Sequence, residues 1–275
     1  MTVLPVADPA PVRLADGRRL LTLRGGAAPP AILFDAGAFG IYADGANLVR
    51  ALAGRGVPAV SYTRANLSGS DPASGPPTLE AHGADMLALL DALGQTGAVV
   101  LAGHSMAGLR LHALAERHPD RVAGLVLIDA MVPGAWPRAA LRTLAGALRP
   151  VERALPALCR TANAYPNAMR LKGRERADKL ASVYAADHLR ASRAEILHAA
   201  RTHIAPAAHV PTFLLPAGRI ARGSADLARR TGARLIDMSA YGHAGVLAPE
   251  PAQHIAEAAM SLLSDQDAAR PELRG

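Results

Sequence analysis

One stretch of ten residues, VVLAGHSMAG at positions 99–108, constrains the fold of this chain more than any other. A short valine-rich apolar run, typical of a fully buried strand, ends at Gly103, and a helical pattern begins at about Met106. Ser105 stands between them, flanked by small residues that let the strand and helix backbones approach closely. The pattern predicts a sharp turn that holds this serine in a strained conformation at its apex. Because Gly-x-Ser-x-small alone can arise by chance, the flanking strand and helix are what favour a nucleophile here.

Strand and helix patterns alternate on both sides of this turn. The expected strands lie near residues 12–14, 20–23, 31–34, 57–62, 98–102, 124–128, 211–215 and 234–238. One expected helix ends near residue 53. The other expected helices cover residues 78–93, 106–118, 224–230 and 251–263. Asp16-Gly17, between the first two strands, is a strong hairpin signal. The alternation predicts an α/β fold, with a mostly parallel central sheet flanked by helices.

The alternation stops between residues 133 and 208, where alanine, leucine and arginine dominate and prolines recur. This composition favours several short helices over a separate folding unit. We therefore expect residues 1–132 and 209–275 to form the core, with residues 133–208 inserted as a helical cap. The chain of 275 residues is long enough for one such domain.

Charge and composition exclude several classes of protein. The net charge is +7, and residues 133–208 carry the whole excess, with thirteen basic and five acidic residues. A solvated helical face explains this excess, since no nucleic-acid motif accompanies it. No apolar run could span a bilayer, and the first residues do not resemble a signal peptide, so we expect a cytoplasmic protein without membrane insertion. The single cysteine, Cys159, excludes an internal disulfide and a cysteine-based metal site.

These segments, in this order, resemble the α/β-hydrolase fold superfamily and its capped members. Residues 34–37 look like the oxyanion-loop segment of the family, residues 103–108 match its nucleophile elbow, and residues 241–244 match the loop that carries its catalytic histidine. Residues 62–72 look like its Asp-Arg-x-Gly-x-Gly-x-Ser loop. That loop departs from the pattern where Thr63 replaces the usual aspartate and where Asn66 replaces a usual glycine.

A serine hydroxyl is a weak nucleophile near neutral pH, so a histidine must take its proton. His243 has the expected context for this base, since it follows a strand and precedes the final helix. His104, beside the serine, is expected to support the turn. The other eight histidines lack such a context: His82, His112, His118, His188, His198, His203, His209 and His254.

The resemblance also implies an oxyanion hole, which needs two preorganised donors. The backbone N–H groups of Met106 and Ala38 occupy the matching positions, and Phe39 is the alternative if the loop is shifted by one residue.

The sequence departs from the family pattern at the acid of the catalytic triad, the carboxylate that orients the histidine. The family usually carries an aspartate in a Gly-x-x-Asp turn, but the matching residues, 215–222, contain no carboxylate. Asp129 is the best replacement, because it ends the strand 124–128 on the same rim as Ser105, and some superfamily members take their acid from this strand. An aspartate here also occurs in members whose acid lies elsewhere. Asp226, Asp237 or the absence of an acid therefore stay as alternatives.

The sequence thus predicts a serine hydrolase that cleaves a small apolar carboxylic ester or lactone through an acyl-enzyme, without a cofactor or metal. Two alternatives stay open. One is a non-hydrolytic enzyme on the same fold, such as a lyase or cyclase, and the other is a binding protein with a relic site. The sequence carries no indication of the oligomeric state.

Overall fold

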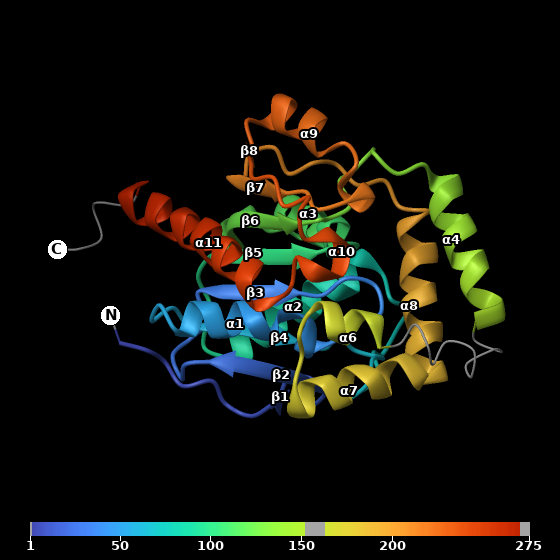
Figure 1. The fold of residues 1–275 in the computed structure, drawn as a ribbon, viewed down its shortest axis with the longest axis horizontal. Helices are drawn as coiled ribbons and strands as arrows, with labels where there is room; N and C mark the ends of the chain where they lie inside the picture. Colours follow the sequence, from blue (N-terminus) through green and yellow to red (C-terminus); the bar gives the residue numbers. More distant parts are fainter. Residues whose placement is uncertain (1, 152–162, 270–275) are drawn as a thin grey trace.

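The computed structural model describes residues 2–151 and 163–269, and Figure 1 shows how they are arranged. These residues form an eight-stranded sheet in the order β1-β2-β4-β3-β5-β6-β7-β8. The strands are β1 (Ala10–Arg13), β2 (Arg19–Gly25), β3 (Ile32–Asp35), β4 (Ala59–Tyr62), β5 (Val99–His104), β6 (Val122–Ile128), β7 (Thr212–Leu215) and β8 (Arg234–Leu235). β2 runs antiparallel to both its neighbours, and the other neighbouring strands are parallel. The expected mostly parallel sheet is confirmed.

Helices cover both faces of the sheet (Figure 1). The core helices are α1 (Ala46–Ala53), α2 (Leu79–Ala92), α3 (Ala107–Arg117), α9 (Ser224–Thr231) and α11 (Pro249–Ala269). Successive strand residues face opposite sides. Leu33 and Leu101 pack with α2 and α3, whereas Phe34 and Ala102 pack with α1 and α11. Because both faces are buried, the central strands are continuous apolar runs.

Further helices lie between β6 and β7, beyond the carboxyl ends of the parallel strands (Figure 1). They are α4 (Arg138–Val151), α6 (Ala164–Ala168), α7 (Gly173–Tyr184) and α8 (Ala186–Ala199). We call them the inserted helices. α4 packs against α8, where Leu141 and Ala145 meet Ile196. Cys159 lies outside the described residues.

Four short helical turns complete the fold: η1 (Tyr42–Gly45), η2 (Pro119–Arg121), η3 (Arg219–Ala221) and α10 (Gly242–Gly245). The largest differences from the predicted bounds are those of β8 and α11. β8 is shorter than expected, although Ile236 and Met238 still donate backbone hydrogen bonds to the β7 segment. α11 runs to Ala269, beyond the predicted end, because no helix-breaking residue follows until Pro271.

Within the described ranges, no helix is long and apolar enough to cross a membrane. The same residues contain no group of three or more histidine, cysteine or acidic side chains placed to hold a metal ion.

Four buried histidines make the stability of the fold sensitive to acid. Burial lowers the pKa of His82, His112 and His188 to about 4, and burial together with the nearby His243 lowers that of His104 to about 3. The unfolded chain binds these protons at its ordinary histidine pKa, about 6.5. The stability that these four neutral histidines contribute is therefore fully present above about pH 6.5 and decreases as the pH falls towards 4. Between pH 7 and 5.5 we expect the free energy of unfolding, measured in urea, to fall by about 5 kcal/mol.

The His112→Asn variant isolates one of these contributions. His112 Nδ1 accepts a hydrogen bond from the Ala207 N–H over 3.2 Å, and an asparagine oxygen can replace this acceptor without titrating. The pH dependence should shrink by about a quarter in this variant and stay unchanged in His254→Asn, which alters an exposed histidine. Equal stability of the wild type at pH 7 and 5.5 would contradict the interpretation.

Candidate active site

The turn between β5 and α3 holds Ser105 in a left-handed conformation, with φ +58°. Such a backbone conformation is costly for a residue other than glycine and persists only where the surroundings enforce it. The small neighbours make that possible. A Cβ on Gly103 would lie 2.5 Å from the Leu111 side chain, and one on Gly108 would collide with the Met131 carbonyl. The strand, turn and helix expected at residues 99–108 are therefore present, with the serine at the apex.

His243 lies in α10 and is held by Asp129, the residue that follows β6. Its Nδ1 donates to Asp129 Oδ2 over 2.6 Å. Asp129 Oδ1 accepts the backbone N–H groups of Ala217 and Gly218, over 3.0 and 2.8 Å. Burial raises the pKa of Asp129, but the hydrogen bonds from His243 and the two amides outweigh it and hold that pKa below its usual value. A charged Asp129 can only accept, which places the proton on His243 Nδ1 and leaves Nε2 able to accept a proton.

The other two candidate carboxylates are engaged elsewhere. Asp226 is exposed on α9 and pairs with Arg229 and Arg230. Asp237 is also exposed and accepts the Ser239 N–H over 2.9 Å. The segment after β7, where the resemblance leads one to expect the acid, instead supplies the amides that bind Asp129.

His104, the last residue of β5, supports His243 rather than the turn alone. Its Nε2 lies 2.8 Å from the His243 carbonyl oxygen, and the two ring centroids are 4.4 Å apart. Burial lowers the pKa of His104 to about 3, so the ring is neutral and donates this hydrogen bond. A neutral His104 ring can pack against the His243 ring without adding a like charge beside it.

The loop after β3 lies directly against the elbow. A Cβ on Gly37 would come within 2.7 Å of Ser105 Cβ, so only glycine fits there. Within the described part of the chain, the N–H groups of Ala38 and Met106 donate to no protein acceptor. The Phe39 N–H, the alternative donor, is occupied by Ser192 Oγ at 3.2 Å. The geometry thus favours Ala38 over Phe39.

Ser105, His243, Ala38 and Met106 line one cavity of about 360 Å³. Its wall comes from the core and from the inserted helices and is mainly apolar. The apolar side chains are Phe39, Met106, Met131, Leu144, Tyr165, Val183, Leu189, Ile196 and Ile220. Lys179 and Asp44 also reach the wall, but the lysine is neutralised by both aspartate oxygens at 2.9 Å. Of the ten histidines, His104 and His243 line this cavity, and the other eight do not.

Thr63 and Asn66, which depart from the family pattern within residues 62–72, each form a hydrogen bond with a nearby backbone amide. Asn66 has φ +66°, a conformation that asparagine tolerates better than most residues, and its side chain accepts the Ala73 N–H. Thr63 Oγ1 accepts the Tyr42 N–H over 3.0 Å in the buried interior. Neither Thr63 nor Asn66 lines the cavity.

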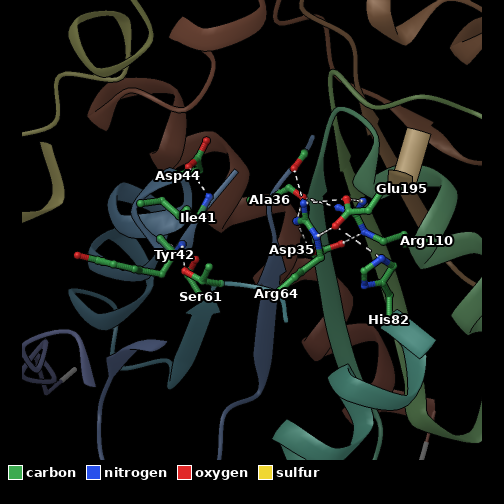
Figure 2. Close-up of polar contacts among 12 residues, drawn as sticks. Asp35, Ala36, Ile41, Tyr42, Asp44, Ser61, Arg64, His82, Arg110 and Glu195 are labelled. Atoms are coloured by element: carbon green, nitrogen blue, oxygen red, sulfur yellow. Dashed lines mark hydrogen bonds and ion pairs between the residues drawn. The ribbon is translucent and has the colours of Figure 1, made fainter. Parts of the chain in front are cut away.

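Sequence reasoning missed a buried charge cluster behind the loop, which joins Asp35, Arg64, Arg110 and Glu195 (Figure 2). Burial raises the pKa of Glu195, but the arginines and the nearby His82 lower it to about 2, so the carboxylate is charged. Arg110 could have been noticed, because it interrupts a buried helix face. Glu195 gave no signal, since acidic residues are common on helices.

A family model described as the alpha/beta hydrolase fold matches residues 30–155. A mouse protein, sn-1-specific diacylglycerol lipase ABHD11, is 35% identical over 130 residues, which are 47% of this chain and 42% of that protein. The match thus spans less than half of this relative's length.

Two solved structures share the fold over almost their whole length. A thermophilic esterase from Thermogutta terrifontis has a TM-score of 0.69 and 20% identity, covering 94% of this chain and 99% of that one. The enol-lactonase from Burkholderia xenovorans LB400 also has a TM-score of 0.69, with 21% identity, covering 94% of this chain and 100% of that one.

Proposed function

We propose that this chain, which has the α/β-hydrolase fold and belongs to the superfamily that the fold defines, is a serine hydrolase acting on carboxylic esters or lactones. The observation that carries the proposal is the 2.6 Å contact between His243 Nδ1 and Asp129 Oδ2, at the cavity that Ser105 lines. The esterase and the enol-lactonase among the structural neighbours support this reaction class. Since fold alone does not fix chemistry, the proposal rests on the site.

The proposed reaction uses each residue in one role. His243 Nε2 takes the proton of Ser105, whose oxygen attacks the carbonyl carbon. The N–H groups of Ala38 and Met106 stabilise the oxyanion that forms, and Asp129 stabilises the charged imidazole. His243 then gives the proton to the departing alkoxide, which leaves as an alcohol. Water, activated by the same histidine, releases the acid and regenerates the serine.

We also propose that residues 133–208 act as a cap over a core made of residues 1–132 and 209–275. The inserted helices supply Leu144, Tyr165, Val183 and Leu189 to the cavity wall. A volume of about 360 Å³ is at the low end for sites that bind small molecules. A small substrate with an apolar acyl group fits this space.

A panel of p-nitrophenyl esters tests the proposal. We expect turnover of the butyrate and octanoate, and kcat/KM should fall for the hexadecanoate because its chain exceeds the enclosed volume. γ-Lactones and dioctanoylglycerol extend the panel, the latter because the mouse relative is named a diacylglycerol lipase. Modification of Ser105 by a fluorophosphonate without turnover of any panel member would favour the non-hydrolytic alternative. Absence of both modification and turnover would favour a binding protein.

A further inference from the structure

The buried charge cluster connects the inserted helices to the oxyanion loop (Figure 2). Asp35 ends β3, Arg64 follows β4, Arg110 lies in α3 and Glu195 lies in α8. Each side chain is at most 3% exposed, and the two arginines balance the two acids. Buried charges persist only when they are paired and fully hydrogen-bonded, so the cluster fixes the relative positions of four elements.

Arg64 joins the cluster to the loop backbone. Its Nη1 donates to the Ala36 carbonyl over 2.7 Å and its Nη2 to the Gly37 carbonyl over 3.0 Å. In a planar trans peptide the C=O and N–H bonds point in opposite directions. The Gly37 carbonyl and the Ala38 N–H belong to one such peptide group. Because Arg64 holds the carbonyl on the cluster side, the Ala38 N–H faces away from the cluster.

Glu195 determines where the Arg64 guanidinium lies. Its two carboxylate oxygens accept from Arg64 Nε and Nη2, each over 3.1 Å, in a bidentate pair that fixes the plane of the guanidinium. Ser192, one turn earlier on the same face of α8, accepts the Phe39 N–H. Lys179 of α7 donates to the Phe39 carbonyl over 3.0 Å. The inserted helices therefore hold the loop at several adjacent peptide groups.

We propose that Glu195 is a positioning residue for the oxyanion hole: through Arg64 it sets the direction of the Ala38 N–H, so α8 is part of the catalytic geometry as well as of the pocket wall. This inference rests on the proposed function. It predicts a defect in the transition state rather than in substrate binding, since a donor that aims at the oxyanion contributes little to the bound ester.

The Glu195→Gln variant tests the proposal, because glutamine keeps the shape and one acceptor but loses the charged bidentate pair. Loss of a whole oxyanion donor costs about 10²–10³ in kcat, so a misdirected donor should lower kcat about 10-fold. KM for p-nitrophenyl butyrate should stay within about twofold. Hydrogen exchange of the peptide covering residues 36–40 should become faster, a readout that does not depend on activity.

The control is Asp85→Asn, which breaks the partly buried Asp85–Arg18 pair away from the loop. It should lower Tm without changing kcat. In a folded Glu195→Gln variant, unchanged kcat would overturn the proposal. A rise in KM that accounts for the whole loss of kcat/KM would overturn it too. If this variant does not fold, Ser192→Ala decides: a kcat about threefold lower with unchanged KM supports the role of α8, and wild-type kcat contradicts it.

These results are distinguishable from failure of the proposed function. A wild type that turns over no ester refutes the proposed function, and the catalytic role of Glu195 is then refuted with it. Faster exchange in the variant would still show that Glu195 orders the loop. An active wild type with unchanged kcat in the folded variant refutes the positioning role alone.

Discussion

The Ser105→Ala variant is expected to lose ester turnover by about 10⁶-fold in kcat, the effect of removing the nucleophile from a serine hydrolase whose triad acts as a unit. The cavity offers no second hydroxyl at the elbow, because the other polar side chains that line it are Tyr165, His104, His243 and the paired Asp44 and Lys179. Initial rates on p-nitrophenyl butyrate measure the loss.

The fold should be unaffected, since alanine is smaller than serine and Ser105 Oγ makes no hydrogen bond to another described residue. Circular dichroism and Tm check this point. Ser264→Ala, an exposed change on α11, is the matched control and should keep wild-type rates. Turnover in Ser105→Ala within about tenfold of the wild type would place the nucleophile elsewhere.

Replacement of Asp129 by asparagine should lower kcat by about 10⁴-fold, as the equivalent change does in serine proteases. An asparagine oxygen can still accept the Ala217 and Gly218 amides, so the local structure should survive. Its NH₂ group would then face His243 Nδ1, favour the wrong tautomer and leave the imidazolium without a compensating charge.

The two other candidate carboxylates supply matched controls for this prediction. Asp226→Asn and Asp237→Asn each neutralise an exposed aspartate that contacts arginines or a backbone amide rather than His243. Both variants should retain wild-type kcat. A loss of several orders of magnitude in either one, with near-normal rates in Asp129→Asn, would move the acid to that residue.

Much of this architecture was predictable because it depends on local patterns. Continuous apolar runs mark strands buried on both faces, and the small residues around Ser105 mark a close crossing of strand and helix. The Asp16-Gly17 pair likewise predicted a hairpin between the first two strands. In the structure Gly17 has φ +89°, and β1 pairs antiparallel with β2. Such signals are contained within a few residues, so a single sequence carries them in full.

The sequence pointed to Asp129 as a candidate acid but did not determine its contacts. Its hydrogen bonds run to residues 217, 218 and 243, about 90 to 115 positions away. Strand order places these loops on one rim, but which carboxylate meets the histidine depends on loop geometry. The absence of a carboxylate in residues 215–222 was the informative signal, because it directed the search to other carboxylates on the same rim, of which Asp129 was the best candidate.

The buried charge cluster lay beyond sequence reasoning for the same physical reason. Glu195 meets Arg64 across 131 positions, and each residue alone has the character of an ordinary surface charge. Only the packing of α8 against the loop shows that the pair is buried. The same packing joins the inserted helices to the loop beside Ser105, so these helices do more than line the cavity.

Reaction with an alkyl fluorophosphonate, followed by peptide mass spectrometry, tests whether Ser105 is the nucleophile. We expect one phosphonyl adduct in the wild type, located on Ser105, because this serine shares its cavity with His243 and with the backbone of Ala38 and Met106. The adduct should be absent from Ser105→Ala and should form far more slowly in Asp129→Asn. A wild-type protein that stays unmodified, or that carries the adduct on a different serine, would contradict the account.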